Sequence, residues 1–357
     1  MPAARAEALE GLIASAELDG LLITHLLNVR YLAGFTGTNG LCAVAPGVRS
    51  FYTDFRYTGQ AGREVDGFDL DPEDRELAKA ALAALAGSGG GRVGFEDAHV
   101  SVRQLEKLRE MAPDGLELVP AGDLVEKLRA VKDAGELTAI REAAKAVTGI
   151  YDHLREVEFA GRTERQVAVL LENEMRARGS EPSFPSIVAA DPNSALPHHT
   201  PGDTVIAPGS LVVVDMGCVV DGYCSDCTRT FAAEGVSDHA HEIYDLVRAA
   251  QEAALEAVKP GADCKAVDSV ARDMIEAAGH GERFGHGLGH GVGLEVHEGP
   301  NLSQRSEGSL ETGNVVTVEP GVYLPDDLGV RIEDLVVVGA DGPEALTSFP
   351  KSLITLE

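Results

Sequence analysis

The spacing of apolar and polar residues predicts two regions with different organisation. Over residues 19–55, short apolar runs alternate with Gly, Asn and Pro turn signals, and helical spacing follows over residues 75–86. The glycine-rich stretch 87–92 precedes the strand-like VGFE, which favours a turn over a phosphate-binding loop. This region therefore reads as a compact α/β domain.

The second region begins with strongly helical patterning. Apolar residues recur at helical spacing over residues 123–157, and a further helix is expected over 163–178, with Thr163 before it and Gly179 after it as caps. From residue 187 onward, strands and helices alternate. We place two domains at 1–128 and 129–357, and the fold class is α/β (α+β).

Composition and charge narrow the possible partners and location. The 357 residues are 44% hydrophobic and 25% charged, which is typical of a globular protein, and a net charge of -28 disfavours nucleic acid and anionic membranes as partners. The opening segment lacks the apolar core of a secretory signal, and no apolar run approaches the roughly 18 residues of a membrane span. Five cysteines, an odd number, disfavour a disulfide framework, so we expect a cytoplasmic protein.

The segment LVVVDMGCVVDGYCSDCTRTFA predicts a hairpin that carries two acidic residues. If the turn lies at Asp221 and Gly222, then Asp215 is diagonal to Asp226 and both side chains project from one face. Asp215 follows four apolar residues, where an unpaired charge is costly. A cation between the two carboxylates relieves that cost, so the hairpin indicates a metal site.

A second hairpin is predicted in VVTVEPGVYLPDDLGVRIEDLVVV. Folding this segment about Asp326 brings Glu319 opposite Glu333, and strand alternation places Arg331 on the side of Glu333. Arg331 has either a catalytic role or a structural one as a partner of Asp334 or Glu333. Two hairpins with two carboxylates each indicate an oxygen-rich site for two cations.

Histidines in two further segments are candidate ligands and catalytic groups. His286, His290 and His297 lie among the glycines of FGHGLGHGVGLEVHEGP, where glycine permits close backbone approach and unusual dihedral angles. His198 and His199 lie in SALPHHTPGD, upstream of the first hairpin.

These segments, in this order, resemble the pita-bread metallopeptidase family of methionine aminopeptidase, aminopeptidase P, prolidase and creatinase. LPH, VVDMG, GHGVGLEVHE, TVEPG and GVRIED look most like its proline-specific branch. The N-terminal LDGLLITHLLNVRYLAGFTGTNG and YTDFRYTGQA resemble the creatinase-type accessory domain. The resemblance implies a C-terminal pita-bread (creatinase/aminopeptidase-like) catalytic domain preceded by an N-terminal creatinase-type α/β domain.

The resemblance also implies roles for single residues. The five positions that match the family's metal ligands are Asp215, Asp226, His290, Glu319 and Glu333. His198 and His297 match its catalytic histidines, and His199 is a weaker candidate, because many relatives have glycine there. Two cations would activate a water for attack on the scissile carbonyl, with Glu319 accepting its proton.

The expected activity is hydrolysis of an Xaa-Pro bond at the N-terminus of a short peptide. An Xaa-Pro dipeptidase is the leading hypothesis, and an Xaa-Pro aminopeptidase that acts on longer peptides is the alternative. A non-catalytic binding protein and a creatinase-like hydrolase are disfavoured by the full ligand set. Manganese is the expected metal, with cobalt, zinc and iron as alternatives, and the family implies a homodimer.

Two remaining residue sets have weaker interpretations. Tyr223, Arg331 and the N-terminal domain are candidate walls of a proline pocket. Cys224 and Cys227 form a CxxC motif, but no second such motif or histidine pair lies at zinc-finger spacing, so we interpret them as small residues that pack beside the ligand strand.

Overall fold

The computed structural model describes residues 2–72, 76–89 and 91–356. The chain divides between Arg129 and Ala130 into two compact units, here called the N-terminal unit and the C-terminal unit. This division is one residue beyond the predicted boundary. The helix expected from residue 75 begins at Leu77 in the structure, and residue 75 itself lies outside the described residues.

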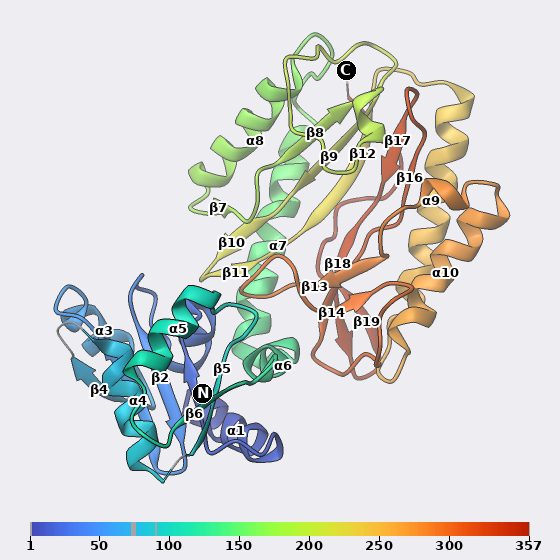
Figure 1. The fold of residues 1–357 in the computed structure, drawn as a ribbon. Helices are drawn as coiled ribbons and strands as arrows, with labels where there is room; N and C mark the ends of the chain where they lie inside the picture. The colour runs from blue at the N-terminus through green and yellow to red at the C-terminus, as the bar shows by residue number, and fades with distance from the viewer. Residues whose placement is uncertain (1, 73–75, 90, 357) are drawn as a thin grey trace. The chain divides into compact units, whose positions relative to one another are not determined.

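The N-terminal unit is a six-stranded sheet with helices on its faces, as Figure 1 shows in blue to cyan. The strand order is β4-β3-β2-β1-β5-β6; β1 pairs antiparallel with β2 and parallel with β5. Its strands are β1 (Gly20–Ile23), β2 (Leu41–Ala45), β3 (Val48–Thr53), β4 (Asp69–Pro72), β5 (Arg92–Phe95) and β6 (Glu117–Pro120). Its helices are α1 (Pro2–Ser15), α2 (Leu26–Ala33), α3 (Thr58–Glu64), α4 (Leu77–Gly87), α5 (Val102–Met111) and α6 (Leu124–Ala130). The α/β prediction for this region is confirmed.

The C-terminal unit contains two main sheets, with strand orders β20-β12-β9-β8 and β14-β13-β15-β18-β19. The strands of its first half are β7 (Glu181–Pro182), β8 (Ile187–Ala190), β9 (Leu211–Met216), β10 (Cys218–Val220), β11 (Tyr223–Cys224) and β12 (Cys227–Ala233). Those of its second half are β13 (Gly289–Gly291), β14 (Glu298–Leu302), β15 (Val315–Val318), β16 (Gly321–Tyr323), β17 (Gly329–Arg331), β18 (Asp334–Gly339), β19 (Gly342–Ala345) and β20 (Thr355–Leu356). The helices are α7 (Ala134–Leu154), α8 (Glu164–Ala177), η1 (Asn193–Ala195), α9 (Asp238–Ala257), α10 (Cys264–Ala277) and η2 (Gly281–Arg283).

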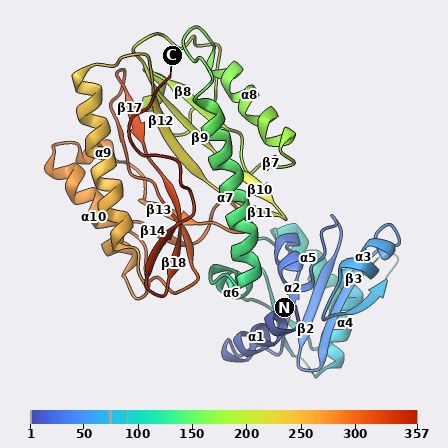
Figure 2. The same ribbon diagram turned by 180° about the vertical axis from the view of Figure 1, so that it is seen from behind.

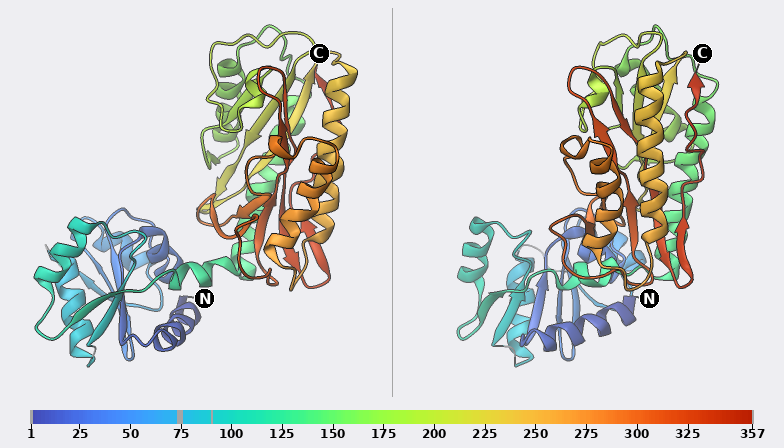
Figure 3. Two further views of the ribbon diagram at one scale, coloured as in Figure 1. Left: turned by 45° about the vertical axis from the view of Figure 1, so that its right-hand side comes forward. Right: turned by 90° about the vertical axis from the view of Figure 1, so that its right-hand side faces the viewer.

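Each half of the C-terminal unit has its own helix pair and its own apolar core. Helices α7 and α8 pack with β8, β9 and β12, whereas α9 and α10 run side by side and pack with β15 to β18, as Figures 2 and 3 show. Because each sheet buries one face against its helices, the other faces are available to build a site where the halves meet.

The long helical pattern over residues 123–157 is two helices rather than one. Helix α6 ends at Ala130, and Asp133 begins α7 by accepting hydrogen bonds from the backbone N–H groups of Gly135 and Glu136. The Glu136 carboxylate in turn accepts a hydrogen bond from the backbone N–H of Asp133, which completes a capping box. Apolar periodicity alone does not show such a break, but the D-x-x-E signal does.

The predicted caps of the next helix are confirmed. The Thr163 hydroxyl accepts from the backbone N–H of Gln166, and Gly179 adopts φ 80° just beyond the end of α8. Within the described part of the chain, every helix is too short or too polar to span a bilayer.

Candidate dinuclear metal centre

The first hairpin has the predicted register. Strands β10 and β11 pair about the turn at Asp221 and Gly222, whose φ angles are 47° and 75°. Further out, β9 pairs with β12, and Asp215 lies opposite Thr228. Asp226 is two residues from Thr228 and is therefore diagonal to Asp215, as expected.

The second hairpin also folds as predicted. Val318 pairs with Asp334 at the end of β15 and β18. Gly321 pairs with Arg331 at the start of the next ladder, β16 and β17. Glu319 and Glu333 lie between these two pairs and therefore face each other. The hairpin closes at Asp326, which adopts φ 63°. Local strand pairing therefore delivers two carboxylates here, as it does in the first hairpin.

Glycines allow the strand that carries His290 to approach its neighbours closely. A Cβ on Gly289 would lie 2.0 Å from the Thr317 carbonyl oxygen, and one on Gly291 would lie 2.2 Å from the Gly299 carbonyl oxygen. The expectation of close approach is confirmed. The expected unusual dihedral angles are not found, because none of the glycines in the described segment 285–293 has a positive φ angle.

The structure brings all five predicted ligands together. Asp215, Asp226 and Glu333 are buried, and one carboxylate oxygen from each lies within 4.8 Å of the others. His290 Nε2 lies 3.2 Å from Glu319 Oε1 and 3.7 Å from Asp226 Oδ2. Four acidic side chains and one imidazole thus converge from three separate segments, the two hairpins and β13.

The hydrogen bonding of this cluster fits bound cations. Asp215 Oδ1 and Glu333 Oε1 are buried and have no hydrogen-bond partner among the described residues. The other Glu333 oxygen accepts from the Thr228 hydroxyl at 2.7 Å. A buried carboxylate oxygen without a donor is costly, and coordination to a divalent cation removes that cost. An oxygen-rich donor set with one imidazole suits borderline and hard cations.

The electrostatics of the cluster lead to the same conclusion. Burial, and then repulsion by neighbouring carboxylates, raises the pKa of Asp226 and Glu333 well above the usual range. Burial also acts to raise the pKa of Glu319, but its contact with His290 outweighs burial and holds this pKa below its usual value. In the absence of cations, the cluster therefore favours protonation of Asp226 and Glu333 over protonation of Glu319.

Arg331 has a different partner from those expected. Its Nη2 donates to Asp215 Oδ2 at 2.7 Å, its Nη1 donates to the Tyr323 hydroxyl at 3.0 Å, and its Nε donates to Thr228 Oγ1 at 3.0 Å. The predicted partner Asp334 is instead bound by Arg229 and Lys351. Arg331 therefore holds Asp215 Oδ2, and Asp215 Oδ1 is left to bind a cation in the cluster.

A cavity of about 960 Å³ opens onto the five ligands. His198 and His297 are exposed at its lining, and the rings of His297 and His290 lie 4.3 Å apart. Arg331 also lines it, but Tyr223 is not among the lining residues: its hydroxyl donates to Glu136 at 3.1 Å. The interpretation of Tyr223 as a pocket wall is wrong.

His199 is engaged by a buried carboxylate. Its Nε2 lies 2.8 Å from Glu164 Oε2, and the same carboxylate accepts from the backbone N–H groups of Ala190 and Gly202 and from the Asn193 amide. His199 thus helps to hold the loop that carries His198.

Tyr323 was missed as a site residue, and His286, one of the three candidate histidines, is its partner. His286 Nε2 lies 2.9 Å from the Tyr323 hydroxyl, which connects it through Arg331 to Asp215. Tyr323 has the same strand parity as Glu319 and Arg331, and this alternation is the signal that could have identified it.

The cysteines beside Asp226 lie outside the group of candidate ligands that the described residues form around it. Burial raises the pKa of the Cys227 thiol far above its usual value, and its Sγ contacts the Glu333 carbonyl oxygen at 3.5 Å. Cys224 is likewise buried, as expected for small residues that pack beside the ligand strand.

Comparison with known proteins is consistent with this geometry. Residues 138–340 match the model of metallopeptidase family M24, and residues 5–131 match the creatinase/prolidase N-terminal domain. This chain belongs to metallopeptidase family M24. The family is metal-dependent, and the predicted pita-bread fold with a creatinase-type N-terminal domain is confirmed.

Within family M24, similar proteins cover the whole chain. An uncharacterized peptidase, YqhT, of Bacillus subtilis is 42% identical over 351 residues, 98% of this chain and 99% of the relative. An Xaa-Pro dipeptidase of Pyrococcus furiosus is 42% identical over 65% of this chain and 67% of its own length. The solved structure of an Xaa-Pro dipeptidase from Bacillus anthracis superposes with a TM-score of 0.97 at 38% identity and covers 100% of both chains.

Proposed function

We propose that this chain is an Xaa-Pro dipeptidase that uses two divalent cations held by Asp215, Asp226, His290, Glu319 and Glu333. The observation that carries the proposal is the convergence of these five side chains at one cavity, with buried carboxylate oxygens that have no donor within residues 2–72, 76–89 and 91–356. The similarity to Xaa-Pro dipeptidases from Pyrococcus furiosus and Bacillus anthracis supports the choice of substrate.

The ligand residues also have roles in the reaction. The cation pair, when bound, supplies Lewis-acid activation of water and of the scissile carbonyl. Glu319 would be the group that accepts the proton of the attacking water, because it lines the cavity and the Thr317 hydroxyl holds its Oε1 in place at 3.0 Å.

His198 and His297 are placed to stabilise the oxyanion. Both line the cavity beside the ligand cluster. Burial, together with nearby His290, lowers the pKa of His297, so its ring is neutral at pH 7 and can donate one N–H.

The cavity lining supports recognition of a short proline peptide. Phe184, Pro185 and Ile187 offer an apolar surface to the proline ring. Arg331 is committed to Asp215, whereas Arg305 lies exposed at the cavity and can meet the C-terminal carboxylate of a dipeptide. An arginine at that end of the substrate favours dipeptides over longer chains.

An assay on matched substrates tests this proposal. The metal-restored protein should cleave an Xaa-Pro dipeptide faster than an Xaa-Pro-Yaa-Zaa tetrapeptide and faster than the dipeptide amide, which lacks the carboxylate. Arg305→Ala should raise KM for the dipeptide about tenfold or more and leave the amide unchanged. Faster cleavage of the tetrapeptide would instead establish the Xaa-Pro aminopeptidase alternative, which the similarity to an X-Pro aminopeptidase structure from Thermotoga maritima supports at 35% identity.

Three further features belong to the proposal. Manganese is the proposed metal because four of the five ligands are carboxylates. A cytoplasmic location is supported by five buried cysteines with free thiols. A homodimer rests on the family resemblance, and sedimentation of the purified protein measures it.

A further inference from the structure

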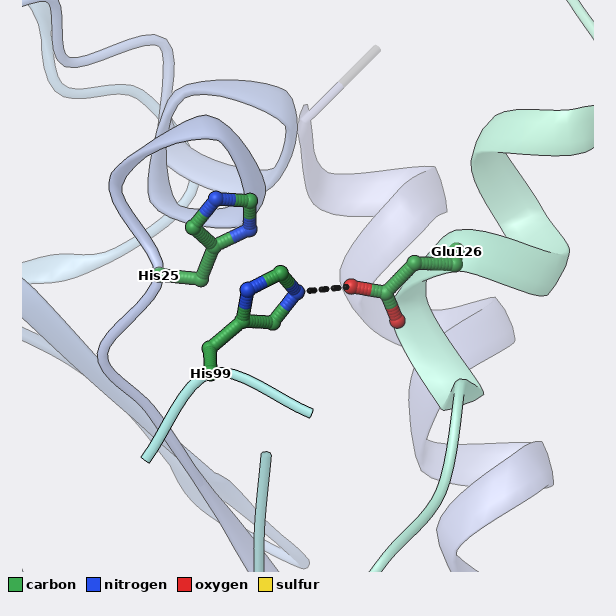
Figure 4. A group of neighbouring side chains, drawn as sticks. All are labelled: His25, His99 and Glu126. Carbon is green, nitrogen blue, oxygen red and sulfur yellow. Dashed lines mark hydrogen bonds and ion pairs between the residues drawn. The ribbon is translucent and has the colours of Figure 1, made fainter. Parts of the chain in front are cut away.

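A second group of metal-binding side chains lies within the N-terminal unit. It consists of His25, His99 and Glu126, and one candidate ligand atom from each lies within 4.8 Å of the others. His25 precedes α2, His99 follows β5, and Glu126 projects from α6, so three separate elements meet here (Figure 4).

We propose that His25, His99 and Glu126 form a binding site for one zinc-like divalent cation, separate from the catalytic cluster and independent of the proposed peptidase activity. Two imidazoles and one carboxylate are a complete set of protein ligands for a four-coordinate ion whose fourth position is taken by water. This nitrogen-rich set favours zinc, cobalt or nickel over manganese.

The spacing of the group is close to that of a coordinated ion. His99 Nε2 lies 3.3 Å from Glu126 Oε1, and ligand atoms of a tetrahedral zinc site lie about 3.3–3.5 Å apart, given metal–ligand bonds of about 2.0–2.2 Å. The His25 and His99 rings are stacked, with centroids 3.6 Å apart and planes at 11° (Figure 4). Since the two ring planes are nearly parallel, one ring has to turn about its χ angles for both to face one ion.

A second layer of hydrogen bonds holds the carboxylate of Glu126 and the backbone of His25. The Asn28 amide donates to Glu126 Oε1 at 2.5 Å, and its own oxygen accepts from Arg129 Nη1 at 2.8 Å. The buried Glu96 accepts from the backbone N–H of His25 at 2.7 Å and from Asn28 Nδ2 at 2.7 Å. Supporting contacts of this kind are typical of metal sites, because they fix the direction of the ligands.

The site is also accessible to a cation from solution. The side chains of His99 and Glu126 are 29% and 24% exposed. His25 occupies the N-cap of α2, where Ser, Thr, Asp or Asn is usual, and its side chain makes no capping hydrogen bond. Its ring stacks on His99 instead, so the residue serves the cluster and not the helix end.

Counting bound ions tests the proposal. Metal-free full-length protein is saturated with Zn²⁺, desalted and analysed by mass spectrometry for metal per chain. The unsubstituted protein should bind one zinc ion more per chain than either variant, His99→Ala or Glu126→Gln. Glutamine is chosen at position 126 because its amide oxygen can still accept the hydrogen bond from Asn28. With Mn²⁺ the three proteins should bind equal numbers. Circular dichroism checks that the variants are folded.

Matched controls make the result decisive. His239→Ala removes an exposed histidine that lies 3.4 Å from a single carboxylate, Asp327, and should retain the full zinc count. In an Asp226→Ala background the His99-dependent zinc ion should remain, which separates this site from the peptidase centre. Equal zinc counts in the unsubstituted protein and His99→Ala, or an equal loss in His239→Ala, would overturn the proposal.

Discussion

Asp226 is a ligand carboxylate whose charge depends on a cation. It is buried, and its pKa is raised by burial and by Glu333 and Asp215, so cation binding must expel a proton from the cluster. Asp226→Ala should lower turnover of an Xaa-Pro dipeptide by roughly a thousandfold or more, about 4 kcal/mol of transition-state stabilisation, while the fold is retained. Near-normal activity of this variant would contradict the assigned ligand set.

The raised pKa values also set the pH dependence of the metal-free protein. A carboxyl group whose pKa is higher in the folded state contributes stability below its unfolded pKa of about 4 and loses it as pH rises through the folded value. We therefore expect the contribution of this cluster to the melting temperature of the metal-free chain to fall as pH rises above about 4. Asp226→Asn, which cannot ionise, should make this fall shallower; an unchanged slope would show that the cluster does not control it.

His198 and His199 are neighbours with different tasks. His198 lines the cavity, whereas His199 is held by Glu164. His198→Ala should keep both metals and slow turnover about 10²- to 10³-fold, the usual effect of losing one oxyanion donor. His199→Ala should lower the stability of the fold more than it lowers kcat. If His199→Ala lowered kcat more than His198→Ala did, the two assigned roles would be reversed.

At the scale of elements, the position of His290 depends on how closely β13 approaches β14. A Cβ on Gly291 would lie 2.2 Å from the Gly299 carbonyl oxygen. Since both partners are backbone, neither can move without shifting a strand. His290 is the residue directly before this contact, so its distance to Glu319 depends on it.

Gly291→Ala should therefore destabilise the fold by about 1–3 kcal/mol and weaken metal binding. Gly285→Ala is the matched control in the same segment: nothing lies within 4 Å of its added Cβ, and its φ is not positive. Chemical denaturation and metal content measure both effects. Equal behaviour of the two variants would mean that close strand approach does not position His290.

At the scale of the whole molecule, cations stabilise the state in which distant segments meet. Ligands on β9, β13 and the turns beside β12, β15 and β18 come together only in the folded chain. Metal at 100 times its Kd should stabilise the fold by about 2.7 kcal/mol, so chelation should lower the melting temperature. Re-addition of metal should restore it, and a melting temperature indifferent to chelation would contradict a folded-state site.

Sequence reasoning was most accurate where the structure is local. The registers of both acidic hairpins could be predicted, because a turn at Asp221 or Asp326 determines every pair along the strands that follow. The caps of α8 and the α/β character of the N-terminal unit follow from equally local signals.

Contacts between distant segments required the tertiary structure. The chain alone could not show that Arg331 binds Asp215 and not Asp334, or that Tyr323 joins it to His286, because each contact depends on how one hairpin packs against another.

The histidine pair of the N-terminal unit illustrates the same division. Nothing in the sequence indicates that His25 and His99 are neighbours. They meet because each follows one of two strands, β1 and β5, that are adjacent in the sheet. Strand pairing and capping are short-range and leave recognisable patterns in the chain, so the ligand hairpins could be derived from the amino-acid order. The packing of sheets and helices is long-range and leaves no such pattern, so the meeting of distant side chains is visible only in the folded protein.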